Sequence, residues 1–290
     1  MKYIFSFLAL SLLVGCAEES AVDIQETAQQ IGDVMASVDE SGGTSNGTMV
    51  MMESHRRFIA AREKAMQPSP LFLLKALGLI PEAQAVACKD TTFTACAASE
   101  KVRDLSGCTI GGATFTGDIT LQFSDAACVL DSNGDTVDRE PNFTVTGRRG
   151  AVLTVTKIGT GQRITRGATA GNFTFSNAGI RRVFTLASQT LFDYTAETTS
   201  DITVTGTSRT DRVMTGGSLR VTNNSSGVTC NYAPSNVTWA STCNCATSGT
   251  WTGSCSDGKD TTIAVTGCGT GTIVVGEDSE ALSFDRCYSL

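Results

Sequence analysis

"DITVTG", residues 201–206, alternates apolar residues with threonine, and this alternation decides the fold class of the chain. In an extended strand, successive side chains point to opposite faces of the sheet. Ile202 and Val204 would therefore face one way, and Thr203 and Thr205 the other. A strand with one apolar and one polar face is typical of an antiparallel sheet with one solvated side.

The same alternation recurs along the chain, in "NFTVTG" from Asn142, "GNFTFS" from Gly171 and "TTIAVTG" from Thr261. Of the 41 threonines, 38 lie from Thr91 onward, and β-branched residues favour strands. We predict a mainly β fold: an antiparallel meander of about twelve strands, in a sandwich or a half-open barrel-like sheet, preceded by a short helical tether.

The strand-like runs also recur, at steps of 30, 30, 29 and 61 residues, and one copy near residue 237 ("VTWAS") would complete a series of about 30. Their last residues are Gly117, Gly147, Asn177, Gly206 and Gly267. A step of about 30 residues holds two strands and two turns, so six hairpin units are one interpretation. The alternative is a chance recurrence of the common Thr-Gly pair.

Residues 16–47 differ sharply from the β region, because they contain seven acidic residues and no Lys or Arg. Ile24, Ala28, Ile31, Met35 and Val38 follow the spacing of a helical seam. Two heptads are short for a coiled coil, so we interpret 16–47 as a solvated acidic tether with a short, weakly associating helix.

Residues 48–87 form a predicted helical segment. One helix is expected from Thr48 to Met66, and a second, "LFLLKALGLI", follows Ser69-Pro70 and ends before Pro81. The ten apolar residues are too few to span a membrane. We expect this second helix to dock on the β domain or on a lipid surface. The alternative is a second signal-peptidase site near Ala85.

The first residues form a secretion signal, with Lys2 before an apolar run from Tyr3 to Val14. The ending Leu13-Val14-Gly15-Cys16 resembles the lipobox of bacterial lipoproteins. This resemblance covers residues 1–16 only. It implies cleavage before Cys16, acylation of Cys16 by lipid chains such as palmitate, and, since Ala17 follows, an outer-membrane destination. The chain would then be held by its lipid, on the periplasmic face or at the cell surface.

The cysteine count fits an exported protein. Removing Cys16 from eleven cysteines leaves ten, which predicts five disulfides. They fall into one group of four and one group of six, with the pairing inside each group left open. A zinc site is the unfavoured alternative. The predicted disulfide residues are Cys88, Cys96, Cys108, Cys128, Cys230, Cys243, Cys245, Cys255, Cys268 and Cys287.

Positive charge is concentrated in the middle of an acidic chain. The net charge is −7, yet ten Arg and one Lys face five acids between Arg139 and Arg220. If the repeats are hairpins, six of these arginines would gather along one rim and could bind an anionic envelope polymer or a lipid head group. The alternative is that they only keep the sheet soluble. The candidates are Arg148, Arg149, Arg181, Arg182, Arg209 and Arg212.

"DSNGDTVD", from Asp131, resembles the opening of an EF-hand calcium loop. Asp131, Asn133 and Asp135 take its first, third and fifth positions, but the loop lacks the glycine and the final glutamate. Asn133-Gly134 is also a strong signal for a type I′ hairpin turn. We favour the hairpin over bound calcium, and no other cofactor is expected.

No catalytic motif stands out. His55 is the only histidine, and we place it in the helical segment, outside the β domain. Ser256 to Lys259 matches S-x-x-K but precedes a strand, so it reads as a turn. Paired carboxylates such as Asp193 with Glu197, or Glu277 with Glu280, leave an envelope hydrolase as an unfavoured alternative.

The sequence therefore predicts four parts: a signal peptide at 1–15, the tether at 16–47, the helical segment at 48–87 and a disulfide-pinned β domain at 88–290. We expect a non-enzymatic envelope lipoprotein with a binding or structural role, without nucleic-acid partners. The main alternative is a surface adhesin that stacks glycans on exposed Trp239, Trp251 or Tyr232.

Overall fold

The computed structural model describes residues 26–36, 45–65 and 87–290. Residues 26–36 form a helix, called the inner helix below, and a longer helix, α2, spans Ser45–Ala65. Two short 3₁₀ turns are η1 (Cys88–Asp90) and η2 (Arg209–Asp211). None of the described helices is long and apolar enough to cross a membrane.

The strands make one large sheet in which every pairing between strands is antiparallel. They are β1 (Glu100–Asp104), β2 (Cys108–Ile110), β3 (Ala113–Phe123), β4 (Thr136–Thr146), β5 (Val152–Lys157), β6 (Gln162–Arg166), β7 (Phe173–Asn177), β8 (Ile180–Leu186), β9 (Gln189–Ser200), β10 (Ile202–Thr205), β11 (Val213–Thr215), β12 (Ser218–Asn223), β13 (Thr229–Trp239), β14 (Ala246–Cys255), β15 (Asp260–Gly267), β16 (Thr270–Val275) and β17 (Asp278–Ser283).

Several of these strands are halves of one interrupted strand. β5 and β6 both pair with β4, and β7 and β8 pair in turn with β6 and β5. The same holds for β9 with β10 and for β11 with β12, while β1 and β2 share the edge beside β3. Twelve strand positions therefore follow one another in meander order, which confirms the predicted fold class.

Glycines permit the interruptions. Gly161, just before β6, has φ +71°, and an added Cβ would lie 2.5 Å from Arg139 O. Gly217, between β11 and β12, has φ +78°, and its Cβ would lie 2.3 Å from Asp201 O. Glycine adopts this left-handed backbone without steric cost and lets the neighbouring strand approach.

The interpretation of six equivalent hairpin units is wrong. The runs that end at Gly117 and Gly147 lie on β3 and β4, which pair directly with each other, Thr116 opposite Thr144. The runs on β7 and β10 are also direct partners. The recurring Thr-Gly runs therefore occupy non-equivalent places, although the total number of strand positions agrees with the prediction.

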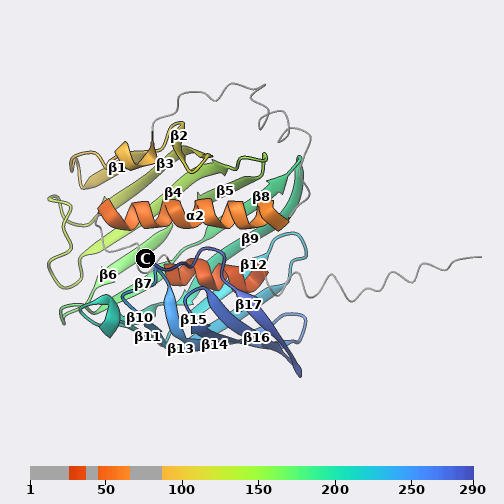
Figure 1. Cartoon of the computed structure of the whole chain (residues 1–290). Helices are drawn as coiled ribbons and strands as arrows, with labels where there is room; N and C mark the ends of the chain where they lie inside the picture. The colour runs from red at the N-terminus through yellow and green to blue at the C-terminus, as the bar shows by residue number, and fades with distance from the viewer. Residues whose placement is uncertain (1–25, 37–44, 66–86) are drawn as a thin grey trace, which may run out of the picture.

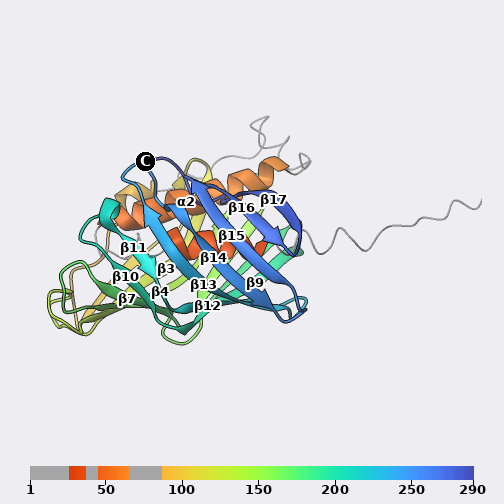
Figure 2. The ribbon, with the colours of Figure 1, turned by 90° about the horizontal axis from the view of Figure 1, so that it is seen from below.

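The alternation places apolar side chains on one face of the sheet and threonines on the other, as expected. Phe143 and Val145 are buried, whereas Thr144 and Thr146 keep solvent contact on the other face. Ile202 and Val204 are likewise buried. The apolar face is concave and curves around the two helices (Figures 1 and 2).

The inner helix lies in this concavity, so the interpretation of residues 16–47 as a solvated tether is wrong for 26–36. Every residue of the helix is buried. The predicted seam residues Ala28, Ile31 and Met35 are all 0 % exposed, because they pack into the core that the sheet encloses, not onto another coiled-coil strand. Ile24 and Val38 lie outside the described residues.

The helix predicted from Thr48 to Met66 is confirmed as α2, which crosses the concave face of the sheet (Figure 1). Met52 and Ile59 are buried, and Phe58 packs edge-on against Phe184 and Phe192. The predicted helix from Pro70, the site near Ala85 and the signal with Cys16 lie outside the described residues.

The disulfides pair within each cysteine group, as predicted. The pairs are Cys88–Cys108, Cys96–Cys128, Cys230–Cys255, Cys243–Cys268 and Cys245–Cys287. Cys108 lies on the edge strand β2, but Cys230 and Cys255 join β13 to β14 inside the sheet. The three disulfides of the group of six therefore join neighbouring strands, loops and the C-terminal segment, and do not fix an edge strand of the sheet.

Candidate functional site

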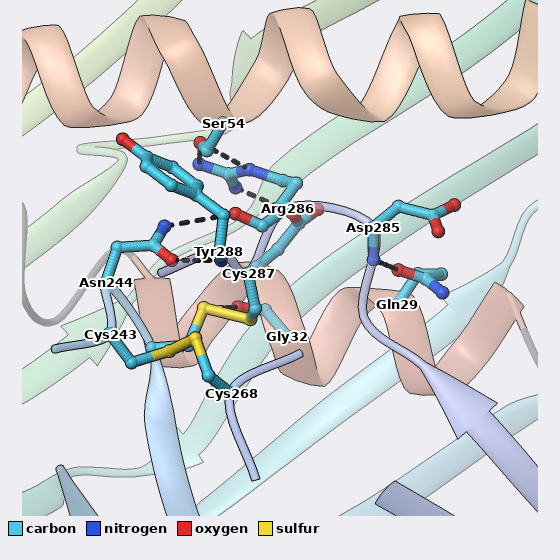
Figure 3. The surroundings of a disulfide bond; sticks show 12 residues. Gln29, Gly32, Ser54, Cys243, Asn244, Cys268, Asp285, Arg286, Cys287 and Tyr288 are labelled. Atoms are coloured by element: carbon cyan, nitrogen blue, oxygen red, sulfur yellow. Dashed lines mark hydrogen bonds and ion pairs between the residues drawn. A yellow bond between two sulfur atoms is a disulfide. The ribbon is translucent and has the colours of Figure 1, made fainter. Parts of the chain in front are cut away.

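A short C-terminal segment, residues 284–288, lies between the inner helix and α2 (Figure 3). Arg286 in this segment is 3 % exposed. Its Nη1 donates to Asp33 Oδ1 at 2.6 Å, and its Nε and Nη2 donate to Ser54 Oγ at 3.1 and 3.0 Å. Arg286 thus links the inner helix and α2 to the C-terminal segment that follows β17.

A second buried arginine reaches the same carboxylate from the sheet. Arg182 Nε of β8 is 2.7 Å from Asp33 Oδ2, and its Nη1 donates to Gln30 Oε1 at 3.2 Å. We call Asp33, Arg182 and Arg286 the Asp33 cluster. Buried ion pairs add little net stability over apolar packing, but removing one partner leaves an uncompensated charge at high cost.

His55 of α2 borders the Asp33 cluster, so its expected place outside the β domain is wrong. Its ring packs edge-on against Phe143 of β4 at 5.1 Å between centroids. Its Nδ1 lies 2.9 Å from Met51 O, so that nitrogen carries the proton and donates. Burial, helped by the nearby Arg286 charge, holds the pKa of His55 well below its usual range.

A very small cavity lies between His55 and the guanidinium groups of Arg139, Arg182 and Arg286. Its volume of about 10 Å³ is near the smallest that holds one water molecule. The cavity therefore has room for about one water molecule beside the His55 ring.

A second charged group lies at Glu26, the first described residue of the inner helix. Arg62 of α2 pairs with Glu26 and, through Nε at 3.1 Å, with Asp285 Oδ2. Burial raises the pKa of Glu26 to about 7, although the Arg62 charge opposes this. Burial also raises the pKa of Asp285.

The raised pKa of Glu26 predicts a pH-dependent stability. Between the ordinary value of 4.5 and about 7, the folded chain holds a proton that the unfolded chain releases. The contribution of Glu26 to the free energy of unfolding should therefore fall as pH rises through this window, by about 3 kcal/mol in total. The lowered pKa of His55 acts in the opposite sense below its ordinary value of 6.5, so the Glu26 contribution is measured as the difference between the native chain and Glu26→Gln in urea unfolding from pH 4.5 to 7.5. Equal slopes in both chains would contradict the assignment to Glu26.

The C-terminal segment is fixed by covalent and polar contacts. Asn244 Nδ2 donates to Arg286 O at 3.0 Å, and Tyr288 N donates to Asn244 Oδ1 at 2.6 Å (Figure 3). Cys287 is bonded to Cys245 next to Asn244. The Arg57 guanidinium lies 4.3 Å from the centre of the Tyr288 ring. These contacts position Arg286 for its ion pair with Asp33.

The end of α2 is joined to the turn between β4 and β5. Glu63 Oε1 accepts from Arg149 N at 2.7 Å, and Arg149 Nη1 donates to Glu63 O at 2.5 Å. A Cβ on Gly147 would lie 2.3 Å from Glu63 Oε1 and 2.4 Å from Ile59 Cγ2. Glycine at 147 therefore lets the helix reach the turn.

The six candidate arginines do not lie along one rim. Arg148 and Arg149 lie in the β4–β5 turn, whereas Arg209 and Arg212 lie at the opposite end of the sheet, because β9 and β10 run away from that turn. The expectation of one rim is wrong because it assumed equivalent hairpins.

The neighbours of the other candidates differ as well. Arg181 is exposed and pairs bidentately with Asp193, at 2.9 and 2.5 Å, while Arg182 points inward to Asp33. Arg209 Nη1 donates to Cys243 O at 3.0 Å, and Arg212 lies 5.8 Å from the Phe173 ring centre. Anion binding stays a prediction, for the exposed arginines.

The Asp131 loop does not form the expected type I′ hairpin, while calcium binding there stays a prediction. Asp135 Oδ2 accepts from the backbone nitrogens of Asp131 and Ser132, at 3.1 and 2.7 Å. Gly134 has φ +86° while Asn133 does not have a positive φ, so the turn is not type I′. Residues 124–135 form a loop before β4, and no three acidic, His or Cys side chains of the described chain form a metal-ligand group.

The aromatic residues that the adhesin alternative requires are in the core. Trp239 is 3 % exposed, Trp251 is 0 % exposed and Tyr232 is 1 % exposed. They lie on the inward face of β13 and β14, so they offer no surface to a glycan. Core packing, the interpretation we favour for these aromatics, is therefore confirmed, and the exposure that the adhesin alternative requires is not found.

Asp193 and Glu197 lie on the convex face, each in an ion pair with an arginine of a neighbouring strand. Asp193 pairs with Arg181, and Glu197 Oε1 is 3.1 Å from Arg220 Nη1. Arg181 and Asn224 hold the pKa of Asp193 below its usual value. Glu277 and Glu280 are exposed at the β16–β17 hairpin.

One larger cavity opens beside the start of the inner helix. Its volume is about 70 Å³, and its lining includes Thr27, Tyr194, Asn223, Tyr232 and Lys259. It has room for a few water molecules. No protein-family model, curated protein or solved structure matches this chain.

Proposed function

We propose that this chain is a non-enzymatic lipoprotein of the bacterial outer membrane, whose β domain is fixed to the lipid on Cys16 through the inner helix. The observation that carries the proposal is the burial of residues 26–36 inside the sheet. Glu26, the first described residue of that helix, is ten residues after Cys16. The anchor therefore connects to the centre of the fold and not to a long tether.

The polar contacts of the inner helix support a structural role for this connection. Asp33 joins the helix to β8 and to the C-terminal segment, and Gln29 Oε1 accepts from Asp285 N at 2.9 Å. A force on the anchor would reach the whole sheet through these contacts. Five disulfides suit a domain that stays folded in an oxidising compartment.

In this proposal the β domain has a binding or structural function at the cell envelope. Arg148, in the β4–β5 turn, is an exposed side chain, and the planar guanidinium group suits phosphate and carboxylate groups. An anionic envelope polymer or a lipid head group is the ligand class we propose for it.

Metabolic labelling with a radioactive or clickable fatty acid tests the anchor. We expect the full chain, made in a Gram-negative host, to carry the label and to fractionate with the outer membrane, and Cys16→Ala to lose both. A labelled Cys16→Ala chain, or an unlabelled native chain in the soluble fraction, would contradict the proposal.

A further inference from the structure

The cavity of about 70 Å³ lies between the inner helix and the concave side of β9, β12, β13, β14 and β15. Thr27 borders it on the helix side. Tyr232 of β13 and Thr261 of β15 border it on the sheet side, and Gly253 of β14 lies between them in the register of the three strands. At about 10–15 Å³ for each water-sized group, the cavity has room for roughly five such groups.

Thr261 brings a buried hydroxyl group without a partner to this cavity. The residue is 2 % exposed, and its Oγ1 has no hydrogen-bond partner among the described residues. Leaving a buried hydroxyl without a partner costs free energy. Buried polar groups of native proteins therefore bind protein atoms, ordered water or a ligand. Thr261 thus indicates that the cavity has an occupant.

Tyr232 adds a second hydroxyl group to the lining. The residue is 1 % exposed, and its burial raises the pKa of the phenol, while the nearby Thr261 hydroxyl opposes this rise. The phenol therefore stays protonated at neutral pH and can donate a hydrogen bond. A Cβ on Gly253 would lie 2.5 Å from Tyr232 Cδ1, so glycine at 253 leaves the space that the Tyr232 ring occupies.

The charges at the cavity favour a neutral occupant. Asp257 and Lys259 are its only charged lining residues in the described chain, and Lys259 Nζ is 3.3 Å from Asp257 Oδ2. Because these two charges compensate each other, a charged ligand would lose its hydration without gaining a counter-charge. Val228 and the disulfide between Cys230 and Cys255 form an apolar part of the wall.

We propose that this cavity binds a short neutral polyol of about the size of glycerol. Its hydroxyl groups both donate and accept, as Thr261 Oγ1 and the Tyr232 hydroxyl require. Its carbon chain contacts Val228 and the disulfide. Small-molecule sites combine such apolar surface with a few placed polar groups. The site does not depend on lipid at Cys16 or on anion binding by Arg148, so its failure would leave the proposed function standing.

Saturation-transfer NMR of the full chain with intact disulfides, titrated with glycerol, tests this site. Binding of so small a molecule should be weak, in the millimolar range. Thr261→Val removes Oγ1 and keeps the branched shape, so we expect glycerol to bind about two- to tenfold more weakly. The free energy of unfolding of this variant should not fall, because it removes a buried oxygen that has no partner.

Thr262→Val is the matched control, since Thr262 is the next residue of β15 and faces the other side of the sheet. This variant should bind glycerol as the native chain does. 1-Propanol, which has a similar carbon chain but a single hydroxyl, should bind several-fold more weakly than glycerol. If Thr261→Val fails to fold, as judged by near-UV circular dichroism, Tyr232→Phe repeats the comparison, because it removes the other hydroxyl and keeps the ring.

Three outcomes would overturn the proposal: no glycerol binding by the native chain, equal binding by Thr261→Val, or 1-propanol binding as tight as that of glycerol. Equal loss of binding in Thr261→Val and Thr262→Val would also overturn it, because the effect would then not come from the cavity. In each case the cavity would hold water only.

Discussion

Asp33→Ala should destabilise the protein by about 3–5 kcal/mol, because it leaves two buried guanidinium groups without their shared carboxylate. Arg182 and Arg286 are 4 % and 3 % exposed, so bulk solvent does not hydrate their charges in place of Asp33. Urea unfolding with intact disulfides, followed by tryptophan fluorescence, measures the change. Trp239 and Trp251 are both buried and report on the core.

Asp193→Ala is the matched control for this prediction. Asp193 also binds an arginine bidentately, but Arg181 is exposed on the convex face. An exposed pair contributes about 0–1 kcal/mol. If Asp33→Ala cost no more than Asp193→Ala, the Asp33 cluster would not hold the inner helix in the folded chain.

Ile31→Asp should destabilise the protein by more than about 4 kcal/mol. Ile31 is 0 % exposed; truncating such a side chain alone costs about 2–5 kcal/mol, and the new carboxylate adds a desolvation cost. The same unfolding measurement applies, with Ile158→Asp as the control at an exposed position. A solvated tether would tolerate both substitutions equally, and that result would contradict the buried inner helix.

The fold class follows from local sequence features. The alternation in "NFTVTG" and "DITVTG" is a property of each single strand. It therefore predicts that Phe143 and Val145 share the buried face, without knowledge of the partner strands. The number of strand positions is predicted from the step of about 30 residues, and it agrees with the structure although the hairpin interpretation behind it is wrong. The pairing does not, because direct neighbours such as β3 and β4 look like copies of one unit when only their spacing is considered.

The buried charged residues of the Asp33 cluster could not be predicted from the sequence. Asp33 lies among acids that are typical of a solvated segment, and Arg286 lies 253 residues later. Neither has a local partner at helical spacing, so nothing in the pattern links them. The one signal for burial was the seam of Ala28, Ile31 and Met35, and it could not specify whether a helix or a sheet would cover it.

The candidate arginines show the same limit. Arg181 and Arg182 are adjacent, yet one faces solvent and the other faces the core, because successive strand residues point to opposite faces. Charge counting along the chain cannot separate them. The register of β8 against β9, with Arg182 opposite Tyr194 and Arg181 opposite Thr195, assigns each its face.

Hydrogen–deuterium exchange of residues 26–36 in the full chain tests the central claim most directly. If the inner helix belongs to the core, its amides should be protected to the level of those of β8, and lose protection only when the sheet unfolds. Exchange of these amides within seconds, with β8 still protected, would show that the helix is not part of the β domain. The account of a directly anchored fold would then be wrong.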